Sequence, residues 1–169
     1  MDYVSESAPG SFGDRQVVLH FFKAGSAGDC PAVLLLHGLM GSPGNFERTA
    51  RGLLELGIPL AAPLYGLRGT VPLERSFGEL ADVAGDILAT RERIDIVGHS
   101  LGGHLGLRLA HEFPGGVRTL VGVGAAFRGL PLPPNPVVRR GVGLVMGRGA
   151  DDLMTAVPFA AAVPAGCSS

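Results

Sequence analysis

IDIVGHSLGG, residues 94–103, is the most informative segment of this chain. Its apolar start is typical of a buried strand, and apolar residues recur at helical spacing beyond it. These later positions are Leu101, Leu105, Leu109 and Phe113. A serine held between small residues where a strand ends and a helix begins is exposed on a strained turn, ready to attack a carbonyl carbon. Ser100 is therefore the predicted nucleophile.

Glycines stand two positions before and after this serine, at Gly98 and Gly102, and His99 lies within the same turn. The chain reverses so sharply there that a side chain at either glycine would collide with a neighbouring strand or helix. The competing interpretation is a glycine-rich connection whose serine only caps a helix. The order of strand, turn and helix favours the nucleophile.

A second glycine-rich turn, HGLMGSP at residues 37–43, directly follows the apolar run 32–36. That run is predicted to be a fully buried strand. An acyl-transfer serine needs backbone N–H groups aimed at the oxyanion that forms during attack. We predict that the amides of Leu39 and Leu101 are these donors. The alternative is an ordinary turn between a strand and a helix.

Three segments resemble a known family: HGLMGSPGNF at 37–46, PLYG at 63–66 and IVGHSLGG at 96–103. The block from about residue 33 to 127 is similar to the front half of an α/β-hydrolase, most of all to bacterial, notably actinobacterial, lipases and esterases. The resemblance implies hydrolysis of carboxylic esters, acyl glycerols among them, through an acyl-enzyme and without a metal or cofactor. It also implies that His37 and Gly38 shape the oxyanion loop.

The resemblance divides the chain into three parts: a polar N-terminal segment 1–15, an α/β-hydrolase core 16–127, and a segment 128–169 rich in Pro, Gly and Ala. Alternating strands and helices predict a mostly parallel sheet with helices on both faces, without the C-terminal strands of the family. The predicted strands are 16–22, 32–36, 59–62, 94–97 and 117–123. The predicted helices are 46–56, 76–88 and the segment after Ser100.

Local signals refine these boundaries. Asn45 is the expected cap of the first helix, and Ser76-Phe77-Gly78-Glu79 has the pattern of a capping box that opens the second. A turn is expected at 25–29. The last segment, 128–169, is predicted to be either a lid over the acyl pocket or an irregular tail.

Composition limits the function classes. The chain has 169 residues, 46% hydrophobic and 17% charged, which is typical of a globular domain. Fourteen basic and fifteen acidic side chains are scattered, so a nucleic-acid surface is not expected. The two cysteines, Cys30 and Cys167, suit neither a disulfide framework nor a metal site.

Location and partners follow from the same reading. Residues 1–10 carry acids and no apolar core, so no secretory signal is expected, and the apolar stretch 119–127 is too short for a bilayer, which takes roughly twenty residues. We expect a cytoplasmic protein with a small ester or acyl lipid as substrate, while the resemblance also allows secretion. The oligomeric state is not predicted.

The rest of the catalytic triad is harder to find. In the α/β-hydrolase superfamily the chain order is serine, acid, histidine, and no histidine follows residue 111. The five histidines are His20, His37, His99, His104 and His111. His99 is expected to leave the turn in a different direction from Ser100, and His20 to be structural. His104, Arg108 and His111 are expected to form one polar stripe on a solvated helix face.

The acid is equally open. Three carboxylates follow the serine: Glu112, Asp151 and Asp152. The run 142–147 could be a strand that presents Asp151 or Asp152 as the triad acid, or the segment from Arg148 could begin a helix of the lid. The simplest hypothesis is the front part of a longer hydrolase. The alternatives are a non-catalytic binding or regulatory protein with this fold, or a base supplied by another chain.

Overall fold

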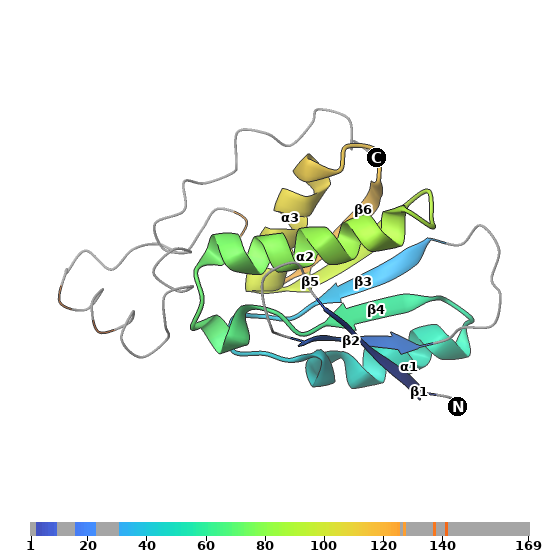
Figure 1. The fold of residues 1–169 in the computed structure, drawn as a ribbon, viewed down its shortest axis with the longest axis horizontal. Coiled ribbons are helices and arrows are strands. Elements are labelled where there is room, and N and C mark those ends of the chain that lie inside the picture. Colours follow the sequence, from blue (N-terminus) through green and yellow to red (C-terminus); the bar gives the residue numbers. More distant parts are fainter. Residues whose placement is uncertain are drawn as a thin grey trace.

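The computed structural model describes residues 3–9, 16–22 and 31–125, with the single residues Phe127, Val137 and Gly141, and only the backbone of the first two ranges. Its strands form one sheet in the order β1-β2-β4-β3-β5-β6 (Figure 1). The strands are β1 (Tyr3–Pro9), β2 (Gln16–Phe22), β3 (Ala32–Leu36), β4 (Leu60–Pro63), β5 (Ile94–His99) and β6 (Val117–Val123). The helices are α1 (Glu47–Glu55), α2 (Leu73–Leu88) and α3 (Leu101–Glu112), with the 3-10 turns η1 (Pro43–Phe46) and η2 (Gly66–Gly69).

Four neighbouring strands, β4, β3, β5 and β6, run parallel. Strand β2 is antiparallel to both β1 and β4. The mostly parallel sheet expected from the sequence is therefore confirmed. Because parallel strands end at the same edge, the segments that follow β3, β4 and β5 meet at one side of the molecule.

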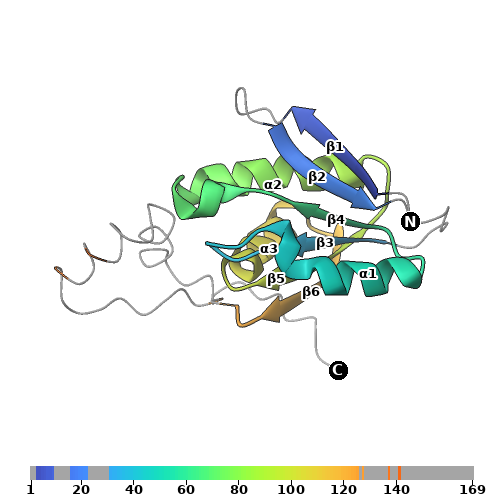
Figure 2. The same ribbon diagram turned by 90° about the horizontal axis from the view of Figure 1, so that it is seen from below.

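Side chains of the central strand β3 alternate between two cores. Leu34 and Leu36 pack with α2 and α3, whereas Val33 and Leu35 pack with η1 and α1. All four are buried because helices cover both faces of the sheet, as Figures 1 and 2 show from two directions. The continuous apolar run 32–36 thus reflects a strand without a solvated face.

Helix boundaries differ from the sequence predictions in two places. Helix α2 begins at Leu73, so Ser76 is a buried residue of its first turn and not the cap. The Glu79 carboxylate, expected in a capping box, instead accepts the Gly66 N–H at 3.0 Å. Asn45 lies in η1, the 3-10 turn before α1, and is not the cap of α1. Its side chain accepts the Ser42 N–H at 2.7 Å. Both corrections arise because the side chains bind a neighbouring turn.

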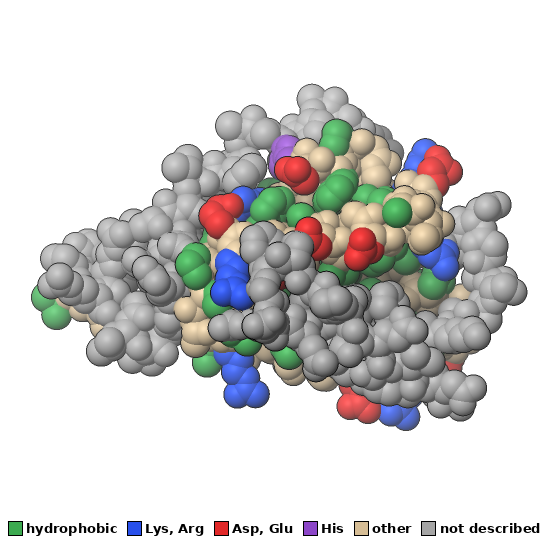
Figure 3. Space-filling model, viewed as in Figure 1, with side chains coloured by type: hydrophobic (Ala, Val, Ile, Leu, Met, Phe, Trp, Pro, Cys, Tyr) green, Lys and Arg blue, Asp and Glu red, His purple; other side chains and the backbone are tan. Residues whose placement is uncertain are grey.

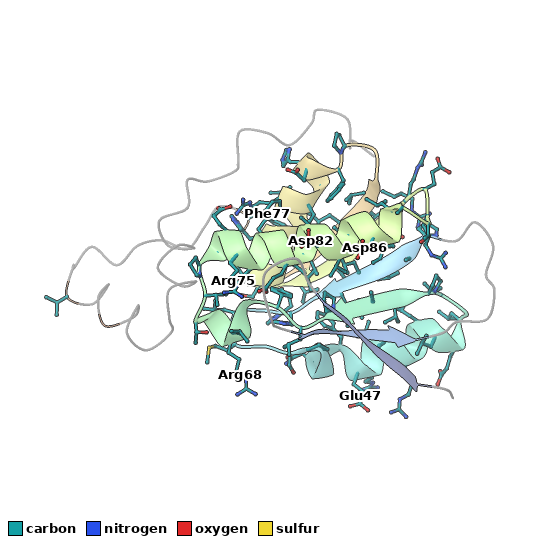
Figure 4. All side chains as sticks on the ribbon, viewed as in Figure 1. Glu47, Arg68, Arg75, Phe77, Asp82 and Asp86 are labelled. Atoms are coloured by element: carbon teal, nitrogen blue, oxygen red, sulfur yellow. The ribbon has the colours of Figure 1, made fainter. Side chains whose placement is uncertain are left out.

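The outer face of α2 is acidic: Asp82 and Asp86 project from it (Figure 4), and acidic side chains, drawn in red, lie along it (Figure 3). Within the described ranges, no helix combines the length and apolar character needed to cross a membrane.

Strand β6 forms one edge of the sheet and pairs with β5. Its residues Val121 and Val123 are about half exposed.

Strand β1 was not predicted, because Tyr3–Pro9 falls within the segment assigned as polar. Strand Gln16–Phe22 is therefore the second strand and not the first, although its limits are as predicted. The expected turn at 25–29 and strand at 142–147 lie outside the described residues, as does nearly all of 128–169.

Candidate active site

Ser100 lies between the last residue of β5 and the first of α3, in the strained turn that the sequence predicts. Its backbone has φ 52° and ψ −115°, a region that side chains rarely enter. The Ser100 N–H donates to the Val123 carbonyl at 3.0 Å, and its own carbonyl accepts the Gly103 N–H at 3.1 Å. The turn is thus bonded to the neighbouring strand on one side and to the helix on the other. The residue is half-buried.

The two flanking glycines are required for space. A Cβ on Gly98 would lie 2.5 Å from the Gly102 carbonyl carbon, and a Cβ on Gly102 would lie 2.6 Å from that of Leu36. Real Cβ atoms essentially never approach backbone so closely. The predicted collisions with helix and strand are therefore confirmed.

The glycine-rich loop 37–41 lies directly against this turn. A Cβ on Gly38 would lie 3.1 Å from His99 Nδ1 and 3.3 Å from the Ser100 Cβ. The loop is closed by a hydrogen bond from the Gly41 N–H to the Gly38 carbonyl at 2.9 Å. Thus the structure brings together the two segments that the sequence singled out.

The two residues expected to donate hydrogen bonds to the oxyanion lie on different segments. Leu39 belongs to the 37–41 loop, and Leu101 follows the Ser100 turn. Leu39 follows Gly38 and packs against the larger core, and Leu101 begins α3 with its side chain buried. Their assignment as donors stays a prediction. The loop and the turn that carry them do meet at one place.

His37 is held in place from several sides. Its Nδ1 lies 2.8 Å from the Gly38 carbonyl oxygen, and its ring stacks on Tyr65 with centroids 4.1 Å apart. The Tyr65 hydroxyl donates to the His37 carbonyl, and the Tyr65 N–H faces His37 Nε2 at 3.5 Å. Burial lowers the pKa of His37, partly opposed by the bond to Gly38. Because both ring nitrogens are engaged, His37 is not placed as a base for Ser100.

Sequence reasoning gave Tyr65 no role, although it lies in the PLYG segment of the family resemblance. Its side chain is buried, and burial raises the pKa of its phenol. The signal in the sequence is a tyrosine three residues after the predicted strand 59–62. Only the pairing of β3 with β4 brings it to His37, 28 residues earlier.

The expected solvated stripe on α3 is wrong. His104 is 1% exposed, and the Arg108 side chain is 15% exposed. Arg108 lies over the Phe77 ring at 4.1 Å and binds both carboxylate oxygens of Glu74, so α2 covers this face. Those hydrogen bonds lower the pKa of Glu74. Packing of α2 on α3, not solvent, surrounds these polar groups.

The other candidates for base and acid are His99 in the turn itself, two residues at the far end of α3, and residues that are not described. His99 is exposed, with its ring over Gly38. His111 and Glu112 end α3, about 15 Å or more from its start at 1.5 Å per residue. Asp151, Asp152 and the side chain of His20 lie outside the described part. In that described part no group of three His, Cys, Asp or Glu residues could hold a metal.

Comparison with known proteins identifies the class. A sequence model of the alpha/beta hydrolase family matches residues 33–166. The chain therefore belongs to the α/β-hydrolase family, as its sheet order and strained serine turn indicate.

Particular relatives vary in chemistry. RutD of Variovorax paradoxus, provisionally named as a carbamate hydrolase, is 38% identical over 116 residues, 63% of this chain and 42% of RutD. An α/β-hydrolase of Novosphingobium aromaticivorans matches with a TM-score of 0.64 at 20% identity, covering 83% of this chain and 50% of that one. An esterase from Exiguobacterium antarcticum matches with a TM-score of 0.58 at 20% identity, covering 70% and 44%. The chain spans about half or less of these proteins.

Proposed function

We propose that this chain carries the nucleophile and the oxyanion site of a serine hydrolase of carboxylic esters, of the lipase or esterase type. The observation that supports this most is Ser100 itself, in a strained turn that packs against the Gly38 loop. Strained backbone of this kind persists only where the surrounding structure over-determines it, and it is concentrated at catalytic and ligand-binding sites.

In the proposed reaction, Ser100 Oγ attacks the ester carbonyl carbon and gives its proton to a general base. The carbonyl oxygen becomes an oxyanion that accepts hydrogen bonds from the Leu39 and Leu101 amides. Collapse of this tetrahedral intermediate breaks the bond between the carbonyl carbon and the alcohol oxygen. The alcohol leaves with the proton that the base returns, and the acyl group remains on Ser100. Water then releases the carboxylic acid and restores the hydroxyl. These steps need no metal or cofactor.

We propose that the described residues do not supply this general base, because both ring nitrogens of His37 are engaged and His104 is buried. We expect this chain by itself to form an acyl-enzyme slowly and to turn over little or not at all. A second candidate function, a non-catalytic binding or regulatory protein with this fold, is favoured by the same observation, since His37 is engaged and His104 is buried.

Acylation in the presence of an external base distinguishes the serine hydrolase from the non-catalytic binding protein. The chain is incubated with p-nitrophenyl acetate, with and without imidazole, and the acyl adduct is located by peptide mass spectrometry. We expect a Ser100 adduct that imidazole accelerates, absent in Ser100→Ala. A chain that stays unmodified at Ser100 in imidazole would favour the binding protein. Rapid steady turnover without imidazole would show that the chain holds its own base.

A further inference from the structure

We infer that Tyr65 is a positioning residue for the oxyanion loop: it holds the His37 imidazole, which in turn sets the direction of the Leu39 N–H. This inference rests on the proposed function, because the Leu39 amide matters to catalysis only where an oxyanion forms. The contacts that support it belong to buried residues at the carboxyl ends of β3 and β4.

The first step is the peptide unit between Gly38 and Leu39. The Gly38 carbonyl oxygen accepts two hydrogen bonds, from His37 Nδ1 at 2.8 Å and from the Gly41 N–H at 2.9 Å. A trans peptide is planar, with its C=O and the following N–H pointing in opposite directions. Two donors that hold the Gly38 oxygen therefore also hold the Leu39 N–H, which points away from them.

The second step is the tautomer of His37. A carbonyl oxygen only accepts, so the proton must lie on Nδ1, and Nε2 carries the lone pair. The Tyr65 N–H faces that Nε2 at 3.5 Å. Burial keeps the ring neutral by lowering the pKa of His37. One neutral tautomer thus satisfies both ring nitrogens.

The third step is the ring plane. Tyr65 stacks on the imidazole at an interplanar angle of 13°, and its hydroxyl donates to the His37 carbonyl. Tyr65 therefore contacts His37 through its ring, its hydroxyl and its amide. Phenylalanine would keep the ring contact but leave the buried carbonyl without this donor, which is costly in a low-dielectric interior.

Tyr65 is in turn anchored to α2. The next residue, Gly66, donates its N–H to Glu79 Oε2 at 3.0 Å, and the Arg75 guanidinium binds the other oxygen of Glu79 at 3.2 Å. The Glu79 side chain is only 10% exposed. Arg75 projects from the first turns of α2 towards the segment that holds η2 (Figure 4). A continuous set of contacts joins α2 to the Gly38 carbonyl.

The test compares Tyr65→Phe with the full wild-type chain and with Thr90→Val. Thr90 is the matched control, because its hydroxyl also donates to a backbone carbonyl, that of Ile87 at 3.0 Å, away from the site. Nuclear magnetic resonance reports the His37 ring nitrogens and the mobility of the Leu39 amide. We expect an Nδ1-protonated ring and a rigid Leu39 amide in wild type and in Thr90→Val, and a shifted, more mobile amide in Tyr65→Phe.

The rate of Ser100 acylation by p-nitrophenyl acetate in imidazole should fall about tenfold to a hundredfold in Tyr65→Phe, since misplacing one oxyanion donor costs that order. An unchanged Leu39 amide in Tyr65→Phe, or the same change in Thr90→Val, would overturn the inference. So would a wild-type Leu39 amide with an order parameter below about 0.6, a measurement that needs no variant. Resonance changes as expected, with no acylation of the wild type, would support the positioning and reject the proposed function.

Discussion

The turn at Ser100 and the turn at 66–69 contain all the non-glycine residues with positive φ in the described ranges, yet they are supported in opposite ways. Ser100 has φ 52°, and Leu67 and Arg68 have φ 38° and 54°. Both turns follow parallel strands at the same edge of the sheet. Backbone surrounds the first turn, whereas Leu67 is 41% exposed and Arg68 projects outward (Figure 4).

The two turns maintain their backbone strain by different means. At Ser100, close backbone contacts across Gly98 and Gly102 leave the chain no other path. At 66–69, hydrogen bonds hold the chain: the Thr70 hydroxyl donates to the Leu67 carbonyl at 2.9 Å, and Glu79 accepts the Gly66 N–H. Backbone packing therefore maintains the strain at Ser100, whereas a few local hydrogen bonds maintain it at 66–69.

The largest expected effect breaks the packed turn. Gly102→Ala places a methyl group against the Leu36 and His37 backbone, at 2.6 and 2.7 Å from two of its atoms. Because backbone cannot move aside cheaply, we expect a loss of about 3 kcal/mol or more in the free energy of unfolding, measured by urea titration. Gly52→Ala in α1, where a methyl group meets open space, is the control and should stabilise by about 0.5–1 kcal/mol.

The second prediction concerns His37, which connects the loop beside Ser100 to the 66–69 turn through Tyr65. Its folded-state pKa lies below 6.5, so the unfolded chain binds more protons as the pH falls below that value. The His37 contribution is complete above pH 6.5 and is lost on acidification, with a slope of at most about 1.4 kcal/mol per pH unit. His37→Asn should remove this slope in unfolding titrations between pH 7 and 5.

Glu74 affects the free energy of unfolding in a lower pH range than His37 does. Arg108 lowers the pKa of Glu74, so its contribution is complete above pH 4.5 and is lost only below that value. An equal slope above pH 5 in wild type and His37→Asn would contradict the assignment to His37.

A smaller effect is expected at Ser100. Ser100→Gly should stabilise the fold by about 0.5–1 kcal/mol, since glycine adopts positive φ without a Cβ clash. Ser100→Ala keeps the clash and should leave stability nearly unchanged. Both should abolish acylation. Thermal melts of the three proteins test this prediction, and a destabilised Ser100→Gly would show that the turn is not strained.

The smallest effect is expected in the exposed turn. Leu67→Gly relieves positive φ where hydrogen bonds already share the support, so we expect a gain of about 0.5 kcal/mol. Leu56→Gly is the control, because Leu56 is also exposed but has an ordinary φ of −84°. This substitution should lower the free energy of unfolding. Equal effects of the two substitutions in urea titrations would show that the positive φ of Leu67 stores no strain.

Much of the fold was predictable because its signals are local. The strands at 16–22, 32–36 and 117–123 were predicted with the limits that the structure has. Helix starts were less predictable, since Ser76 and Glu79 form a capping pattern but bind other groups once α2 packs beside η2. The burial of His104 and the contacts of Arg108 with α2 were missed because the helix that Arg108 contacts comes from elsewhere in the chain.

The sequence alone determined the serine turn. Glycines lie two residues before and after Ser100, between an apolar strand and an amphipathic helix. This spacing predicts a tight turn, for which sterics allow almost a single backbone conformation. The contacts that hold the loop beside it could not be predicted locally, because the contact of Tyr65 with His37 spans 28 residues and depends on β4 pairing with β3. The glycine pattern itself signals the close backbone packing of the turn, whereas the burial and hydrogen bonding of the loop depend on which residues the sheet order brings together.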